Sequence, residues 1–278
     1  MIKKVLVKKL SKTLEKLPFS FHYAAQQQKL LRPFYLSLAC KFESKLPISI
    51  ENGGVVLTFD DNFIDEWYYA DSLLRKYNWK ATFFVSFIKS LSYQQFDKLI
   101  NLQNRGHEIG GHGFNHFNQC DFVSSCGIKE YINDEIIPLI ESMRQRSIKI
   151  DSFAYPFGSR DERLDYFLLD YFKILRATSY DKVEPDEHNC YFKKRRLIFG
   201  LGIDNNYEHF SEDYIVKLLS YAKKTKQILI LYGHKPVDNP FSKYETKIAT
   251  LENICDFINK NDMKFYTASE LFNYISLN

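Results

Sequence analysis

Two short stretches of the chain contain residues suited to hydrolysis at a metal ion. Asp60 and Asp61 end the sequence Thr-Phe-Asp-Asp at residues 58–61, and His112 and His116 lie four residues apart in a glycine-containing segment. One carboxylate and two imidazoles can hold a catalytic divalent ion that keeps an open coordination position. A second carboxylate beside the first can accept a proton from water. This combination favours an enzyme.

Each of these features also has a plain structural interpretation. An Asp-Asp pair after a strand is typical of a helix N-cap, and histidines between glycines occur in ordinary loops. The sequence Tyr-Pro-Phe-Gly at 155–158 alone indicates a turn, and His234 could be a loop residue after the apolar run at 228–232. The joint occurrence of the histidines with the aspartates favours the metal site.

The candidate residues follow segments with the patterns of strands, which alternate with helical patterns. The predicted strands cover residues 55–59, 80–86, 108–110, 152–155, 173–177, 195–199, 228–232 and 264–266. The predicted helices cover residues 64–77, 93–105, 128–146, 160–171, 211–225 and 243–260, with a last helix from residue 269. About seven βα repeats imply parallel strands with helices outside, closing into a barrel. Such barrels place their chemistry after the strands.

In this order, the motifs resemble those of the polysaccharide deacetylases, also called the NodB homology domain or carbohydrate esterase family 4. The resemblance spans about residues 53–270 and is carried by the sequences at 58–61, 112–116, 155–158 and 231–234 (Leu-Tyr-Gly-His). It implies a distorted (β/α)7 barrel in residues 51–278. Residues 1–50, before the barrel, are predicted to form an N-terminal helical extension. It also implies removal of acetyl groups from N- or O-acetylated sugars with a divalent metal.

The resemblance further implies a role for individual residues. Asp61, His112 and His116 would be the metal ligands. Asp60 would be the catalytic base and His234 the catalytic acid, and the backbone N–H of Phe157 would help to stabilise the oxyanion. The ion is expected to be zinc, with cobalt, nickel and manganese as alternatives. Adjacent strand residues face opposite ways, so Asp60 and Asp61 can divide the two carboxylate roles.

Two positions depart from the family pattern. Many members have an arginine two residues before the motif proline, which orients the catalytic aspartate, and this chain has Ala154 there. Arg176, Arg195 and Arg196 are the candidates to replace it. The family's Asp-x-x-Asp-Trp segment, which orients the acid histidine, has no clear match, and Asp204 is the candidate for that function.

Composition limits the possible partners. The net charge of +4 is too small to indicate nucleic-acid binding, and no nucleic-acid motif accompanies it. Aromatic residues make up 16% of the chain, which fits either core filling or ring surfaces along a sugar-binding groove. We therefore expect an acetylated glycan or glycolipid as the partner and no nucleic acid. The sequence does not indicate an oligomeric state.

The N-terminal segment has the pattern of a basic amphipathic helix. Residues 1–17 contain six lysines and one acid, with apolar residues three or four positions apart. The lysines interrupt the apolar run that a signal peptide requires. The five cysteines show no Cys-x-x-Cys spacing, which favours a reducing compartment. We expect a cytoplasmic protein whose N-terminal helix either binds the inner membrane face peripherally or packs against the barrel.

The leading functional prediction is a metal-dependent hydrolase that removes acetyl groups from an N-acetylated sugar. The substrate would be a polysaccharide, a glycolipid or a lipid-linked glycan. One alternative keeps the fold but changes the amide, giving a deformylase or small-molecule amidohydrolase. Another is a carbohydrate-binding protein whose catalytic site has decayed, which Ala154 leaves open.

Overall fold

The apolar run that follows Gly53 forms strand β1 (Gly54–Asp61), which closes the barrel. The computed structural model describes residues 52–180 and 182–275. Strands β1 to β7 pair in parallel in chain order, and β7 pairs back onto β1. The other strands of the ring are β2 (Ala81–Val85), β3 (Glu108–Gly111), β4 (Ser152–Ala154), β5 (Ile174–Ser179), β6 (Leu197–Gly202) and β7 (Ile228–Gly233). This is the predicted (β/α)7 barrel.

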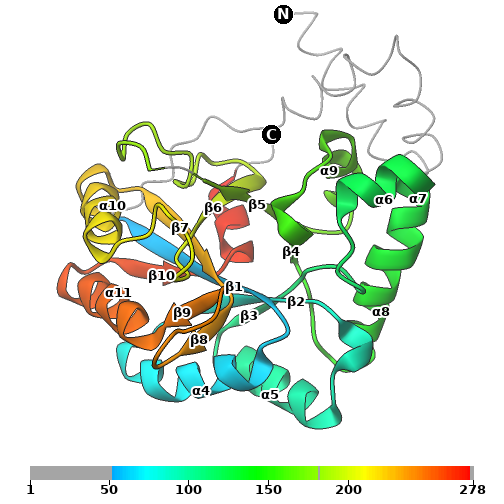
Figure 1. Cartoon of the computed structure of the whole chain (residues 1–278), viewed down its shortest axis with the longest axis horizontal. Helices are drawn as coiled ribbons and strands as arrows, with labels where there is room; N and C mark the ends of the chain where they lie inside the picture. The colour runs from blue at the N-terminus through cyan, green and yellow to red at the C-terminus, as the bar shows by residue number, and fades with distance from the viewer. Residues whose placement is uncertain (1–51, 181, 276–278) are drawn as a thin grey trace, which may run out of the picture.

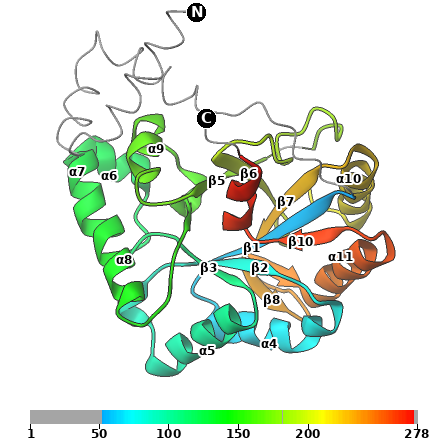
Figure 2. The ribbon, with the colours of Figure 1, turned by 180° about the vertical axis from the view of Figure 1, so that it is seen from behind.

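Helices surround the strands on the outside of the ring (Figures 1 and 2). The α-helices are α4 (Ile64–Leu74), α5 (Tyr93–Asn104), α6 (Gln119–Cys126), α7 (Ile128–Tyr131), α8 (Ile137–Arg144), α9 (Glu162–Leu168), α10 (Glu212–Thr225) and α11 (Ile248–Lys260). Their apolar faces pack on the sheet, where Phe59 and Phe83 stack at 5.7 Å and Phe83 stacks on Trp67 at 5.1 Å between ring centroids. Aromatic packing between helix α4 and strands β1 and β2 thus stabilises the barrel.

The structure corrects several predicted elements. The segment predicted as one helix over 128–146 contains a π-helical turn, η3 (Ile132–Ile136), between α7 and α8. The predicted helix 243–260 begins later, because residues 245–247 form β9 (Glu245–Lys247), which pairs with β8 (Lys235–Val237). The last helix is a 3-10 helix, η5 (Ser269–Tyr274). Helix α6 was not predicted.

One further strand lies outside the ring. Strand β10 (Lys264–Tyr266) pairs with the first half of β1, whose second half pairs with β2. Within the described residues, no helix has the length and apolarity needed to cross a membrane. The predicted N-terminal helical extension, residues 1–50, lies outside the described residues.

Candidate active site

The ends of strands β1, β2 and β3 bring the adjacent aspartates Asp60 and Asp61 close to the two histidines, His112 and His116. The N–H of Ser86, just after β2, donates to the Asp61 carbonyl at 2.8 Å, and the His112 N–H donates to the Val85 carbonyl at 2.9 Å. Asp61 has a left-handed backbone with φ of 83°, which ends the strand. Non-glycine residues rarely adopt this conformation, and those that do concentrate at functional sites.

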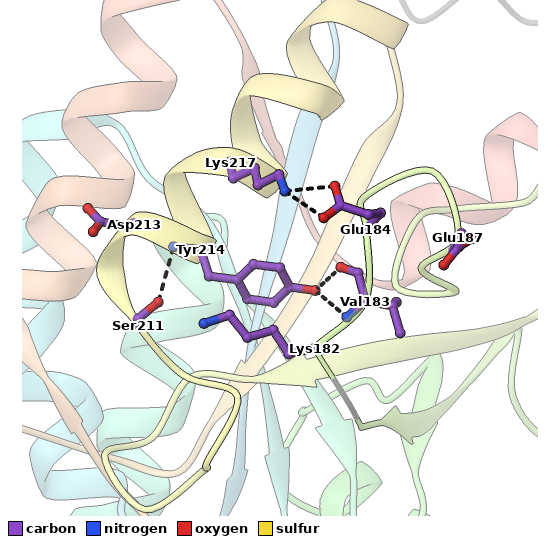
Figure 3. A pocket seen from close by; sticks show the side chains of 8 residues that line it. All are labelled: Lys182, Val183, Glu184, Glu187, Ser211, Asp213, Tyr214 and Lys217. Carbon is purple, nitrogen blue, oxygen red and sulfur yellow. Dashed lines mark hydrogen bonds and ion pairs between the residues drawn. The ribbon is translucent and has the colours of Figure 1, made fainter.

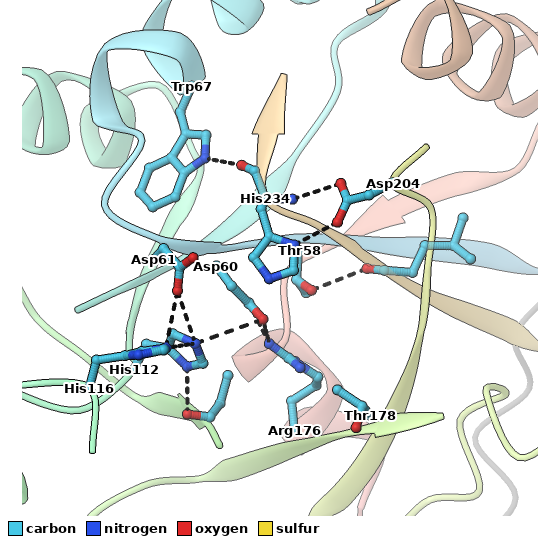
Figure 4. Close-up of polar contacts among 12 residues, drawn as sticks. Thr58, Asp60, Asp61, Trp67, His112, His116, Arg176, Thr178, Asp204 and His234 are labelled. Atoms are coloured by element: carbon cyan, nitrogen blue, oxygen red, sulfur yellow. Dashed lines mark hydrogen bonds and ion pairs between the residues drawn. The ribbon is translucent and has the colours of Figure 1, made fainter. Parts of the chain in front are cut away.

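The three predicted metal ligands converge at this edge of the barrel (Figure 4). The Asp61 Oδ1 atom lies 3.1 Å from His116 Nε2 and 3.6 Å from His112 Nε2, and the two Nε2 atoms are 3.3 Å apart. One ligand atom from each residue fits within 4.8 Å of the others. Two imidazole nitrogens and a carboxylate oxygen directed at one point form an electron-rich set that fits a divalent cation.

The surroundings of this set favour metal-binding protonation states. The Nδ1–H of His112 donates to the Ala154 carbonyl at 2.9 Å, which leaves Nε2 as the free lone pair. Burial lowers the pKa of His112 to about 4, so its ring is neutral at pH 7. Burial raises the pKa of Asp61, but the hydrogen bond with His116 and the nearby histidine charges outweigh it and bring that pKa to about 2.

The neighbouring carboxylate, Asp60, has a different partner. It is 3% exposed, and both of its oxygens accept hydrogen bonds from Nη2 of Arg176, which is fully buried on β5. The Arg176 guanidinium lies 4.9 Å from the ring centroid of Tyr232 and 5.3 Å from that of Phe84. These two aromatic rings offset part of the cost of burying this cation.

Of the three arginines considered as replacements for the family arginine, Arg176 contacts Asp60. Arg195, the predicted orienting arginine, is exposed. The Arg196 guanidinium donates to the backbone carbonyls of Leu169, Phe172 and Lys173. The structure therefore places Arg176, rather than Arg195, beside the proposed base.

His234 is held by two partners from other parts of the chain (Figure 4). Asp204, fully buried, accepts from the His234 backbone N–H at 3.1 Å and contacts His234 Nδ1 at 2.6 Å. Trp67 Nε1–H donates to the His234 carbonyl at 2.8 Å. Burial alone would lower the pKa of His234, but the hydrogen bond and charge of Asp204 outweigh it, with help from Asp60 and Asp61, and the net shift is upward.

Exposed aromatic rings flank these groups on two sides. The rings of Phe87 and Phe157 lie 5.0 and 4.6 Å from the His116 ring, and the Tyr244 ring lies 5.0 Å from the His234 ring. These three aromatic residues are 40–62% exposed and have left-handed backbones, with φ between 52° and 61°. Exposed aromatic side chains on a strained backbone beside a polar site indicate a binding surface.

Several residues of the site were not predicted. Nothing in the sequence distinguished Trp67 or Phe87 from core aromatics, and the contact between Tyr244 and His234 depends on the β8–β9 connection. Glu135, which binds the backbone between the two histidines, belongs to no motif. Its one signal was Pro138, which interrupts an otherwise helical pattern.

A hollow of about 570 Å³ on the described surface is lined by none of the predicted site residues (Figure 3). It lies between the start of α10 and the segment before β6. Its polar groups bond to each other: Lys217 Nζ pairs with Glu184 at 2.7 Å, and Tyr214 Oη donates to the Val183 carbonyl at 2.7 Å. The candidate chemistry is therefore at the strand ends and not in this hollow.

Comparison with known proteins agrees with the motifs. Residues 50–171 match the family model described as polysaccharide deacetylase. A curated relative, a gellan lyase from Bacillus sp, is 32% identical over 122 residues, which are 42% of this chain and 5% of that protein. The chain thus spans only a small fraction of the length of that relative.

Solved structures of similar fold include three related to carbohydrate esterases. The Xyl-CE4 domain of a multidomain xylanase from the hindgut metagenome of Trinervitermes trinervoides has a TM-score of 0.53 at 17% identity, covering 80% of this chain and 91% of that chain. The peptidoglycan deacetylase PdaC from Bacillus subtilis has a TM-score of 0.51 at 16% identity, covering 82% and 93%. A family 4 acetyl xylan esterase from Clostridium thermocellum, in complex with a cobalt ion, has a TM-score of 0.50 at 18% identity, covering 81% and 93%. At these identities the likeness establishes the shared fold.

Proposed function

We propose that this protein is a metal-dependent hydrolase that removes the acetyl group from an N-acetylated sugar. The observation that carries this proposal is the convergence of three groups at one end of the barrel. They are the ligand set of Asp61, His112 and His116, the Asp60–Arg176 pair, and the His234–Asp204 pair. These groups correspond to a metal site, a base and an acid. The substrate would be a polysaccharide, a glycolipid or a lipid-linked glycan.

A divalent ion held by the ligand set, with zinc expected first, would lower the pKa of a water molecule and polarise the acetamide carbonyl. The cobalt ion in the acetyl xylan esterase supports a divalent ion in a barrel of this shape. The donor atoms of Asp61, His112 and His116 fit such an ion in both number and type.

The remaining residues handle protons and orientation. Asp60 accepts the proton of the attacking water, and Arg176 holds the Asp60 carboxylate in place. The backbone N–H of Phe157 donates to the oxyanion that develops as water adds to the acetamide carbonyl. His234 donates a proton to the leaving amine, so that one amide and one water give acetate and a free amino sugar. Asp204 fixes the ring of His234 and favours its protonated form.

The exposed aromatic rings favour a sugar over a small amide. Phe87, Phe157 and Tyr244 present ring faces on both the His116 and the His234 sides of the site. A sugar ring has an apolar C–H face that can cover an aromatic ring, whereas a formamide or other small amide has no comparable surface. This arrangement supports an acetylated glycan as the substrate.

The pairing of Arg176 with Asp60 argues against a decayed site. Ala154 removes the family arginine, and a protein without catalytic function would have no need to place another buried cation on the same carboxylate. A buried arginine without a functional role is costly to retain. The chain therefore keeps all the groups that the proposed reaction requires.

We also propose, from the sequence alone, that the basic segment at residues 1–17 holds the enzyme at the cytoplasmic face of an anionic membrane. That position would place the barrel near a lipid-linked or nascent glycan.

An acetate-release screen tests the proposed function. Full-length protein would be stripped with a chelator, reloaded with zinc, cobalt, nickel or manganese, and incubated with N-acetylated oligosaccharides and with formylated and acetylated small amides. Metal-dependent acetate release from the oligosaccharides is the expected result. Formate release, or turnover of small amides alone, would instead support the amidohydrolase alternative.

A further inference from the structure

We propose that Glu135 is a positioning residue for the metal site: its buried carboxylate is the anion around which the backbone joining His112 to His116 folds. Glu135 is fully buried, on the π-helical turn η3. It is not among the residues that could touch the ion. The inference rests on the proposed metal site and adds a residue that controls how well that site is formed.

The contacts of Glu135 all lie within the loop between and after the two histidines. The backbone N–H of Asn115 donates to Glu135 Oε1 at 3.0 Å and lies 3.1 Å from Oε2, and the Asn115 side chain donates to Oε1 at 2.6 Å. Backbone N–H groups of Phe114 and Phe117 also bond to this carboxylate. The Glu135 carboxylate thus accepts hydrogen bonds from three of the five residues that follow His112.

The loop backbone has the conformation needed to direct these donors inward. Gly113 and His116 both have left-handed backbones, with φ of 81° and 63°. A left-handed residue within a turn brings successive N–H groups together into a concave anion site. A Cβ added to Gly113 would lie 2.7 Å from Glu135 Oε2, so both the backbone angle and the close approach require glycine here.

The π-helical turn explains why Glu135 reaches the loop. Pro138 has no N–H, and its ring excludes the carbonyl four residues earlier, so the regular hydrogen-bond ladder is interrupted between α7 and α8. The widened turn leaves Asn133 and Asp134 exposed and Glu135 buried. Helix α8 is itself fixed against β3, because a Cβ on Gly111 would lie 2.6 Å from the Leu139 side chain.

The fold of this loop sets the distance between the two proposed histidine ligands. His112 follows β3 directly, but His116 reaches the ligand set only if the intervening loop folds back. Without Glu135, the loop N–H groups would lose their shared acceptor, and the loop would rearrange to find another. Groups that orient metal ligands typically change metal affinity by about 10- to 100-fold when removed. We therefore expect Glu135 to govern metal affinity and coordination geometry.

The test compares Glu135→Gln with Asp134→Asn in the full-length protein. Asp134 is the exposed neighbour in the same turn, so this substitution makes the same chemical change without touching the loop. Zinc affinity would be measured by competition with a chelator, and coordination geometry by the visible absorption spectrum of the cobalt-loaded protein. Glu135→Gln should weaken zinc binding by about tenfold or more and alter the cobalt spectrum. Asp134→Asn should change neither.

Thermal unfolding of the metal-free variants separates positioning from general damage. If Glu135→Gln does not fold, Glu135→Asp, which keeps the charge but withdraws it by one methylene, should fold and still bind zinc more weakly. Wild-type zinc affinity and an unchanged cobalt spectrum in the folded Glu135 variant would overturn the inference while leaving the proposed function intact. A wild-type protein that binds neither ion would overturn both.

Discussion

Ala154 on β4 and Arg176 on β5 are direct register partners on adjacent parallel strands. Side chains at paired positions of neighbouring strands project to the same side of the sheet. The small side chain at Ala154 leaves room beside it, and the Arg176 guanidinium reaches Asp60 from the next strand. The cation beside Asp60, the proposed catalytic base, therefore comes from one strand further along the barrel than the family pattern predicts.

This relationship predicts that an arginine at position 154 can replace Arg176 as the partner of Asp60. Arg176→Ala leaves a buried carboxylate without its cation, and we expect acetate release to fall by about 100-fold or more and unfolding free energy by about 3 kcal/mol. Adding Ala154→Arg to that variant should recover part of both losses. Ala154→Arg alone, with Arg176 in place, should destabilise the barrel by overpacking.

The swap is measured as a double-mutant cycle of activity and chemical denaturation. A double variant no better than Arg176→Ala in both readouts would contradict the idea that the two positions are equivalent.

How far the sequence predicted the fold depends on the type of element. Alternation of apolar strands with helical periodicity was enough to predict the barrel, because each repeat must bury one face of a helix on the sheet. Strands β8 (Lys-Pro-Val) and β9 (Glu-Thr-Lys) were missed because each is short and mostly polar or interrupted by proline, and neither has the apolar pattern that marked the other strands. The interruption at η3 was missed because proline marks a break but does not say how the helix accommodates it.

The candidate site shows a similar division. Asp60, Asp61, His112, His116 and His234 could be named because each belongs to a short local motif. The choice of Arg176 over Arg195 could not be made, because it depends on strand register between segments 116 residues apart. Glu135 was missed for the same reason, since its contacts lie 20 residues away and involve backbone groups, which every sequence contains.

Removing one metal ligand should abolish metal binding. His112→Ala deletes a ligand whose ring is already fixed by the Ala154 carbonyl, so we expect most bound metal and nearly all acetate release to be lost. Metal content per chain would be measured after purification and dialysis. A matched control is His209→Ala, because His209 bonds to the Gly202 carbonyl and belongs to no part of the ligand set. Stoichiometric metal in His112→Ala would contradict the assignment.

The pH dependence of activity should report on His234. The proposed reaction requires His234 to be protonated, and Asp204 raises the pKa of His234 above that of an ordinary histidine. On the alkaline side, activity should therefore fall as the pH rises through this raised pKa. In Asp204→Asn, the raising charge is removed while burial still lowers the pKa, so the alkaline limb of the kcat profile should move to lower pH. An alkaline limb at the same pH in both proteins would contradict this role for Asp204.

Membrane binding should depend on the basic N-terminal segment. Six lysines could each contribute about 1 kcal/mol at an anionic surface, and added salt should screen this contribution. Flotation with anionic vesicles at low salt would compare the full-length protein with a chain beginning at Lys41. Full-length protein should float and the shorter chain should not. Equal, negligible binding of both would remove the membrane proposal.

The division of labour between the two adjacent aspartates is the central claim, and Asp60→Asn tests it most directly. Asp61 lies in the ligand set, whereas Asp60 contacts Arg176. Metal content and acetate release would be measured on the same preparation of the variant. We predict that Asp60→Asn keeps the metal content of the wild type while its catalytic rate falls by about 100-fold or more. Loss of the metal together with activity would show that Asp60 is a ligand, and it would contradict the assignment of base and ligand made here.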